Sequence, residues 1–308
     1  MRNRVARPVL LIAAACLTAL TMACSAIDPA PDPAPANTQG YSTGANLIYY
    51  VSLGDSLSQG VQPVGSGGAQ ENTSQGYAND VYTHYRPKLG STFTLVKLGC
   101  SGETSTSMLT GAGSPCYRQG SQLATALAFI KAHRSRIALI TIDIGANDIV
   151  PCVSGTSISA SCKKNGLAEA TRDLPKILSA IHKAAASTTV IAGMTLYDPW
   201  LAYYLLGGAG KTVAEQSLTL IEQLNQLLTT EYRTYGVKKA DVQGTFDTTD
   251  YTQADSIPEG GTAPLDVARI CDWTWMCTSH LNIHANASGY QQIANAYVRI
   301  VGVLRKPG

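Results

Sequence analysis

The chain has 308 residues, a formal net charge of +2, and 45% hydrophobic against 14% charged residues. This length is enough for one domain with a substantial hydrophobic core. Of the 23 basic residues, three arginines lie within residues 1–23, which leaves 20 basic against 21 acidic residues. The composition therefore argues against a nucleic-acid partner, which requires a concentrated basic face.

The first 23 residues have the layout of a signal peptide. Arg2, Arg4 and Arg7 precede an apolar stretch over residues 9–23 that is short for a membrane span. Its length therefore disfavours the alternative, an uncleaved anchor.

Cys24 follows this stretch at once, and a Pro/Ala-rich segment continues over residues 24–44. The arrangement resembles a bacterial lipoprotein signal, although Thr21 replaces the usual larger aliphatic residue. The resemblance implies lipidation of Cys24, membrane attachment through it, and an extended tether. We expect an exported protein, either a cell-surface lipoprotein or a secreted one.

From residue 45 to residue 308 the pattern alternates strands and helices and predicts one domain. The run over residues 137–144 is almost continuously apolar, as in a strand buried on both faces. Strands separated by helices predict an α/β fold with a parallel sheet covered on both sides. The expected strands are residues 47–53, 94–98, 137–144, 189–196 and 237–242.

Three amphipathic helices are predicted from apolar residues at helical spacing. The first carries the stripe from Leu174 to Ile181, with Pro175 expected near its start; the second carries Leu220 to Leu228 and stops at Gly236; the last begins near Tyr290. Residues 245–278 have little periodicity, so we expect a surface excursion there.

Six cysteines remain after Cys16 and Cys24, and six cysteines allow 15 pairings. Pairing between neighbours in the sequence is the simplest, because each pair then brackets one loop. The metal alternative is weak, since no C-x2-C spacing and no histidine doublet occur. Disulfides in an oxidising compartment are favoured: Cys100 with Cys116, Cys152 with Cys162, and Cys271 with Cys277.

The first strand stops at Gly54, Asp55 and Ser56. In open α/β sheets, ligands bind at the carboxyl ends of the strands. A serine there can act as a nucleophile if a base and an oxyanion site exist elsewhere. The alternative is a helix cap, which is a common role for serine.

Four short blocks, at residues 54–58, 99–104, 145–148 and 284–290, resemble in order the conserved blocks of the GDSL, or SGNH, hydrolases. The resemblance spans nearly all of the chain after the signal. It implies a flavodoxin-like, three-layer α/β/α sandwich with a mostly parallel five-stranded sheet. Ser58 stands where a G-x-S-x-G elbow needs glycine, which argues against the α/β-hydrolase fold.

The resemblance also assigns the site. Ser56 would be the nucleophile, and the oxyanion donors would be the backbone N–H groups of Ser56 and Gly102 and the side-chain amide of Asn147. His284 would be the general base. His280 is the competing base, but it lacks the motif that follows His284.

Many family members carry an aspartate three residues before the histidine, where this chain has Leu281. A backbone carbonyl near Leu281 is the favoured acceptor for the imidazole N–H, which would leave a Ser–His dyad. A more distant acid is the alternative. Asn282 is near in sequence, but its side chain need not point toward the ring.

The expected function is hydrolysis of carboxylic esters by a serine esterase or lipase, acting on lipid or short-to-medium acyl esters. The alternatives are a carbohydrate acetyl esterase and a non-catalytic lipid- or glycan-binding surface protein. The apolar segment over residues 201–206 has two equal interpretations, the lining of an acyl pocket or the buried start of a helix, and Trp273 and Trp275 would add aromatic walls to the pocket. No metal or organic cofactor is implied, the partner is an ester substrate, and a monomer is expected.

Overall fold

The computed structural model describes residues 47–258 and 260–307. The predicted signal peptide, the tether and the lipidation site Cys24 lie outside the described residues and stay predictions. Within the described part of the chain, no helix combines the length and the apolar character needed to cross a membrane.

The centre of the domain is a five-stranded sheet in the order β4-β1-β5-β8-β9, and every neighbouring pair is parallel. All five predicted strands are present, and the predicted fold class is confirmed. β1 and β5 are buried along their whole length, as their apolar sequences predict. The strands are β1 (Ile48–Gly54), β4 (Phe93–Lys97), β5 (Ile137–Asp143), β8 (Val190–Met194) and β9 (Lys238–Ala240).

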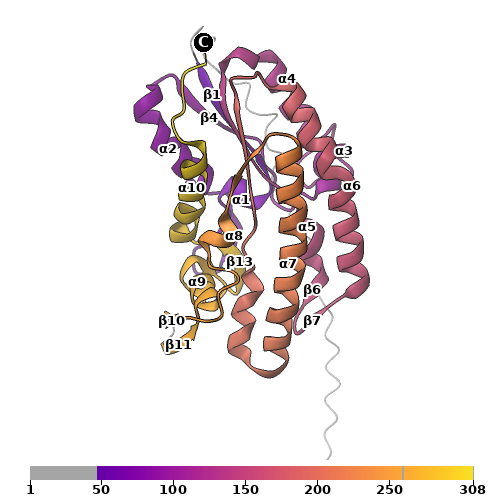
Figure 1. Cartoon of the computed structure of the whole chain (residues 1–308), viewed down its shortest axis with the longest axis vertical. Coiled ribbons are helices and arrows are strands. Elements are labelled where there is room, and N and C mark those ends of the chain that lie inside the picture. Colours follow the sequence, from indigo (N-terminus) through magenta and orange to yellow (C-terminus); the bar gives the residue numbers. More distant parts are fainter. Residues whose placement is uncertain (1–46, 259, 308) are drawn as a thin grey trace, which may run out of the picture. The chain divides into compact units, whose positions relative to one another are not determined.

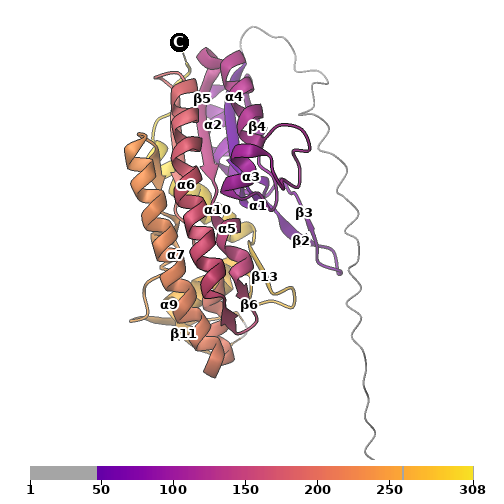
Figure 2. The ribbon, with the colours of Figure 1, turned by 90° about the vertical axis from the view of Figure 1, so that its right-hand side faces the viewer.

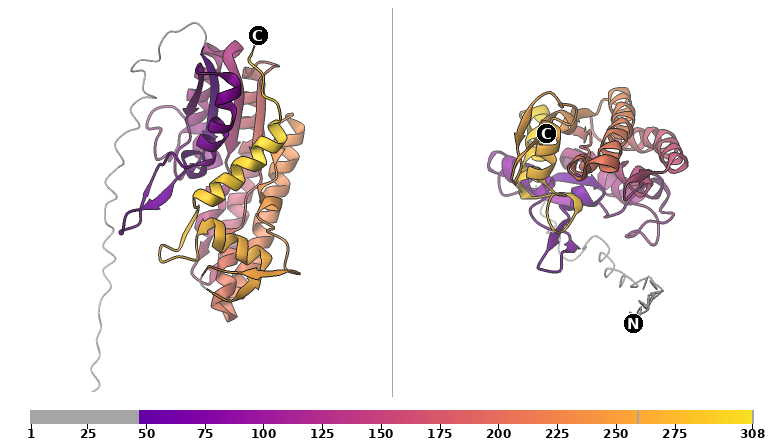
Figure 3. Two further views of the ribbon diagram at one scale, coloured as in Figure 1. Left: turned by 90° about the vertical axis from the view of Figure 1, so that its left-hand side faces the viewer. Right: turned by 90° about the horizontal axis from the view of Figure 1, so that it is seen from below.

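Helices cover both faces of the sheet and complete three layers. α2 (Tyr77–Leu89) and α10 (Ala287–Val301) pack together on one face, while α4 (Gln122–Ala132), α6 (Ala160–Ala184) and α7 (Gly208–Thr234) cover the other (Figure 1). The views from either side show one helical layer in front of the strands in each case (Figures 2 and 3).

Shorter elements follow the carboxyl ends of the strands or form small hairpins. The short α-helices are α1 (Ser56–Gln59), α3 (Ser105–Thr110), α5 (Ala146–Ile149), α8 (Val242–Thr245) and α9 (Leu265–Trp273). The 3-10 helices are η2 (Arg134–Arg136), η3 (Val150–Cys152) and η4 (Pro199–Leu206). The antiparallel pairs are β2 (Gln62–Val64) with β3 (Ala69–Glu71), β6 (Val153–Ser154) with β7 (Ser157–Ile158), β10 (Ala254–Ser256) with β11 (Thr262–Pro264), and β12 (Thr274–Trp275) with β13 (Asn282–Ala285).

The first and last parts of the domain are joined by hydrogen bonds from buried tyrosines. The Tyr290 hydroxyl of α10 donates to the carbonyl of Val61 at 2.9 Å, and the Tyr85 hydroxyl of α2 donates to the carbonyl of Gly302 at 2.8 Å. A buried hydroxyl needs such a partner, so these bonds fix how α10 lies on the N-terminal half.

Pro175 corrects one sequence expectation. It lies in the interior of the 25-residue helix α6 and not near its start. A proline there removes one backbone donor. Buried apolar residues lie on both sides of it, including Leu174 and Ile181, so tertiary packing holds the helix together across the proline.

Residues 245–278 also differ from the expectation, because they are more than a surface excursion. They contain α9, whose Val267, Ala268 and Ile270 are buried. Phe246 is buried too and packs edge-on against Trp273. The segment is a covering layer over the core, and local periodicity does not reveal it because α9 is only nine residues long.

The three predicted disulfides are confirmed. Cys100–Cys116, Cys152–Cys162 and Cys271–Cys277 join cysteines that are 16 residues apart or fewer. The last of these spans the end of α9 and β12, next to the strand β13 that carries His284.

Candidate active site

A pocket lies beyond the carboxyl ends of β1, β5 and β8. The space between its walls and the adjoining open solvent together measure about 470 Å³. Ser56, Asn147 and His284, taken from three separate sequence blocks, all line it. Asp55 is the only carboxylic acid among the described residues of its wall. The rest of the wall is apolar or aromatic: Leu57, Ala146, Ile149, Val150, Leu196, Tyr197, Pro199, Trp200, Ile221 and Ile283.

Ser56 is the first residue of α1, directly after the end of β1. Asp55 caps this helix, with its Oδ1 accepting from the N–H of Leu57 at 2.9 Å. Gly54 has a φ of 133°, and a Cβ there would lie 2.0 Å from the carbonyl oxygen of Asp143. The turn therefore requires glycine before the cap and places the serine, 8% exposed, at the pocket wall.

Two side chains hold the backbone of this turn from beneath. Gln122 accepts from the N–H of Gly54 at 2.8 Å through Oε1 and donates to the carbonyl of Gly54 at 2.9 Å through Nε2. Asp143 accepts from the N–H of Asp55 at 3.3 Å, and the Tyr77 hydroxyl donates to its other oxygen. The nucleophile turn is thus fixed by fully buried partners on β5, α2 and α4.

Burial raises the pKa values of the two acids at this turn, Asp55 and Asp143. It raises the pKa of Asp55 to about 6 and the pKa of Asp143 well above its usual value, and each is further affected by its neighbour. Two ionised carboxylates at short range would repel each other, so this pair holds a proton at mildly acidic pH.

The candidate oxyanion donors Asn147 and Gly102 differ in whether their N–H groups already make hydrogen bonds. Asn147 donates through Nδ2 to the carbonyl of Glu103 at 3.0 Å and, over a longer 3.3 Å contact, to Oδ2 of Asp55. Gly102 is exposed, has a φ of 82°, and within the described residues its N–H makes no hydrogen bond. Gly102 is not among the residues that line the pocket.

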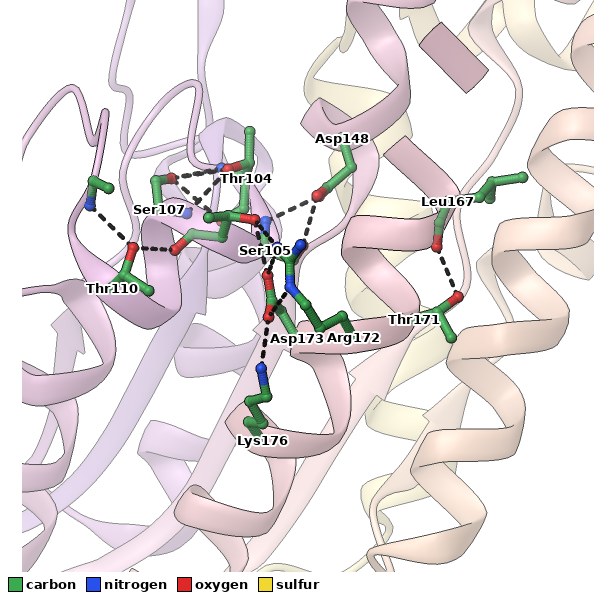
Figure 4. Close-up of polar contacts among 12 residues, drawn as sticks. Thr104, Ser105, Ser107, Thr110, Asp148, Leu167, Thr171, Arg172, Asp173 and Lys176 are labelled. Atoms are coloured by element: carbon green, nitrogen blue, oxygen red, sulfur yellow. Dashed lines mark hydrogen bonds and ion pairs between the residues drawn. The ribbon is translucent and has the colours of Figure 1, made fainter. Parts of the chain in front are cut away.

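Asp148 braces the loops that carry these donors. Its carboxylate accepts from the N–H of Ser105 at 2.9 Å and from the Ser105 hydroxyl at 2.5 Å, so it ties α5 to the start of α3 (Figure 4). Asp173 of α6 accepts from the Thr106 hydroxyl at 2.8 Å, and Arg172 beside it lowers the pKa of that carboxyl to about 2. Asp55 and Asp148 therefore serve as cap and turn carboxylates.

His284 lies on β13, is 6% exposed, and contacts the pocket through its ring. Its Nδ1 lies 2.7 Å from Oδ1 of Asn282. Burial lowers the pKa of the imidazole to about 4, so the ring is neutral and able to accept a proton at neutral pH. The ring and the Ser56 hydroxyl make no mutual hydrogen bond among the described residues, and such contacts often tighten only when substrate binds.

The match to a known family covers all of these site residues. A family model for the GDSL-like lipase/acylhydrolase family matches residues 52–292. The chain belongs to this family. No curated protein matches the chain.

Solved structures resemble the chain at low sequence identity, and the first two below have TM-scores above 0.5, which shows a shared fold. The extracellular lipase of Streptomyces rimosus is 19% identical, with a TM-score of 0.51 over 82% of this chain and 99% of its own. A protein of Parabacteroides merdae described as a GDSL-like lipase is 17% identical, with a TM-score of 0.51 over 83% and 96%. An acetyl xylan esterase of Geobacillus stearothermophilus is 17% identical, with a TM-score of 0.48 over 85% and 98%.

For this GDSL-family chain, several expected pocket residues lie elsewhere. Trp273 and Trp275 do not line the pocket: Trp273 packs against Phe246, and Trp275 packs edge-on against His280. His280 is also outside the pocket wall. The aromatic partners of Trp273 and Trp275 thus lie outside the pocket wall as well.

The apolar segment after β8 is divided between three surroundings. Pro199 and Trp200 line the pocket, Leu201 and Ala202 are buried in the core, and Leu206 is 69% exposed. Of the two interpretations of residues 201–206, the pocket lining is therefore wrong, and the buried helix start holds for Leu201 and Ala202 in η4. The two residues just before them line the pocket.

The acceptor for the histidine N–H is also different from the favoured one. The contact at Nδ1 is made by the side chain of Asn282 and not by a backbone carbonyl near Leu281. Gln122 and Asp143 carry no recognisable sequence signal either, because their roles depend on contacts between segments more than 60 residues apart.

Proposed function

We propose that the protein hydrolyses carboxylic esters with Ser56 as nucleophile and His284 as general base. The observation that carries this proposal is that Ser56, Asn147 and His284 meet on the wall of one pocket although they come from distant segments. A buried, neutral imidazole on the same pocket wall as a serine at a helix start supports acyl transfer.

The reaction then follows two steps. The Ser56 oxygen bonds to the ester carbonyl carbon while its proton passes to His284, and the carbonyl oxygen becomes an oxyanion held by the N–H groups of Ser56 and Gly102 and by Asn147. The bond to the alcohol breaks as His284 returns the proton to it. Water then attacks the acyl-serine by the same route, which releases the acid and restores Ser56.

Binding an oxyanion requires Asn147 to give up one of its present contacts. The 3.3 Å contact to Asp55 is the weaker of the two, whereas the 3.0 Å bond to the carbonyl of Glu103 holds the amide in place. The N–H of Gly102 makes no hydrogen bond within the described chain, so it adds a donor without breaking one.

The pocket wall supports an acyl chain longer than acetyl as the preferred acid part. Ten of its lining residues are apolar or aromatic, and they extend from Leu57 beside the serine to Ile221 on α7. Such a wall gains free energy with each methylene that it takes out of water, about 0.8 kcal/mol for a CH₂ group. We therefore propose lipid or medium-chain acyl esters as substrates. The three disulfides support export of the protein to an oxidising compartment.

Covalent labelling tests the proposal. A fluorophosphonate is expected to modify one serine of the wild-type protein, and peptide mass spectrometry should place the label on Ser56 because only an activated serine reacts at neutral pH. The matched control is Ser58→Ala, which removes a buried hydroxyl two residues away that donates to the carbonyl of Asp55. Label that persists in Ser56→Ala, or that is lost in Ser58→Ala alone, would contradict the assignment.

Ile221→Ala is expected to shift the chain-length preference toward longer acyl groups. Ile221 is 2% exposed on α7 and lines the pocket, so its truncation deepens the space for the acyl chain. We expect the ratio of kcat/KM for p-nitrophenyl octanoate over butanoate to rise about tenfold, since one or two methylenes are worth roughly 1–3 kcal/mol in such a pocket.

Leu228→Ala is the control for this change. Leu228 is also fully buried on α7 but is not among the pocket residues, so its truncation costs stability of the same kind without enlarging the pocket. An equal change of the octanoate-to-butanoate ratio in both variants would show that Ile221 does not define the acyl site.

A further inference from the structure

The side chain of Asn282 has an unusual position for a residue of this chain, because two donors converge on its single oxygen. Oδ1 accepts from the backbone N–H of His284 at 2.9 Å and lies 2.7 Å from Nδ1 of the same residue. Asn282 is itself only 9% exposed. We propose that Asn282 is the positioning residue of the active site, which holds His284 as the Nδ1–H tautomer; this inference rests on the proposed function.

The first contact fixes the orientation of the amide. A backbone N–H can only donate, so the Asn282 atom that it meets must be the oxygen and not the NH₂ group. The same oxygen then faces Nδ1, which can only be the protonated nitrogen. Nε2 is left with its lone pair free, as a base that takes a serine proton requires. Without the bond from the backbone N–H, the amide could rotate by a half-turn so that its NH₂ group faces Nδ1. The ring would then be held as the Nε2–H tautomer.

A side chain at position 281 is not placed to hold the histidine ring. Its side chain is 72% exposed and its φ is 44°, so the residue sits in a left-handed turn with its side chain in solvent. Position 282, in contrast, is a strand residue of β13 paired with Trp275 of β12. On the other side, the Tyr197 hydroxyl donates to the carbonyl of Ile283 at 2.8 Å and fixes the backbone between Asn282 and His284.

The neutral amide of Asn282 positions the ring without placing a negative charge beside Nδ1. The titratable groups that share the pocket wall with His284 are Asp55 and Tyr197. Burial alone lowers the pKa of His284, to about 4. A carboxylate at position 282 would favour the imidazolium and raise this pKa.

Three variants test the role through kcat, KM and the acid limb of kcat/KM for a p-nitrophenyl ester. Asn282→Leu keeps the size but loses the acceptor, so kcat is expected to fall about 10²- to 10⁴-fold with KM nearly unchanged, as for other orienting residues. Asn282→Asp keeps the acceptor, so it should retain kcat and move the acid limb upward from about pH 4 by one pH unit or more.

Leu281→Asp is the matched control, because it adds the same carboxylate one residue earlier, at the position where related proteins carry their acid. With an exposed side chain there, kcat and the acid limb should remain within twofold and a few tenths of a pH unit of the wild type. A Leu281→Asp profile that shifts like that of Asn282→Asp would overturn the proposal, as would wild-type kcat in Asn282→Leu.

The wild-type protein provides a test that does not depend on a variant folding. In the ¹⁵N-labelled protein at pH 7, with the His284 signals assigned by their loss in His284→Gln, the ring is expected to carry its proton on Nδ1. A proton on Nε2 would overturn the proposal. The Ser56→Ala variant separates failure of the proposed function from failure of this inference. If Ser56→Ala is active, the hydrolase mechanism is refuted. If Ser56→Ala is inactive but Asn282→Leu is fully active, only the role of Asn282 is refuted.

Discussion

Replacing Ser56 with alanine is expected to lower kcat for ester hydrolysis by about 10⁶-fold, the scale found when a serine hydrolase loses its nucleophile. In the proposed mechanism the hydroxyl forms the covalent intermediate, and no other serine or cysteine thiol among the described residues lines the pocket. KM should change little, because the apolar wall that we propose as the acyl site is untouched. The fold should persist, since Ser56 contributes only a small side chain at 8% exposure.

Initial rates with p-nitrophenyl butanoate, measured for the wild type, Ser56→Ala and the double variant Ser56→Ala/His284→Ala, provide the measurement. The double variant should be no slower than the single one, because a base without its nucleophile contributes nothing further. Ser58→Ala serves as the matched serine control and should stay within about tenfold of the wild type. A residual kcat of Ser56→Ala within tenfold of wild type would remove Ser56 from the mechanism.

Gly54→Ala is expected to destabilise the fold by about 4 kcal/mol or more, which is exceptional for the addition of one methyl group. The added Cβ would lie 2.0 Å from the carbonyl oxygen of Asp143 and 2.6 Å from its side chain, and φ at this residue is 133°. Since both obstacles belong to the buried end of β5, neither can move away without breaking the sheet.

Gly155→Ala is the control for the backbone effect. Gly155 also has a positive φ, 55°, but nothing lies within 4 Å of the position that a Cβ would take there, so only conformational strain of about 1 kcal/mol is expected. Urea unfolding followed by circular dichroism compares the two free energies of unfolding. Equal losses in the two variants would mean that the contact with Asp143 is not what makes glycine necessary at position 54.

The layers of this fold can be predicted well from the sequence because burial leaves a direct pattern. β5 is evident from its unbroken apolar run, and α7 and α10 from apolar residues at helical spacing. The residues that we propose for the chemistry are also recognisable, because Ser56, Asn147 and His284 each stand in a short motif at the end of a strand or before a helix.

The supporting contacts are not recognisable in this way, because they depend on geometry that no local pattern encodes. Asn282 is the partner of His284 through the turn at Leu281, whose left-handed conformation aims one side chain outward and the next inward. Trp273 and Trp275 precede His284 closely in sequence, but α9 turns them toward Phe246 and His280 and away from the pocket.

The docking of α10 on α2 joins the two ends of the domain, and the proposed site needs both of them. The proposed nucleophile directly follows the first strand of the domain, whereas the proposed base closely precedes its last helix. The bonds from Tyr290 to Val61 and from Tyr85 to Gly302 close the chain into one unit only when its end has been made. A nascent or C-terminally shortened chain would therefore carry the serine turn without the proposed base, and we expect it to remain inactive until folding is finished.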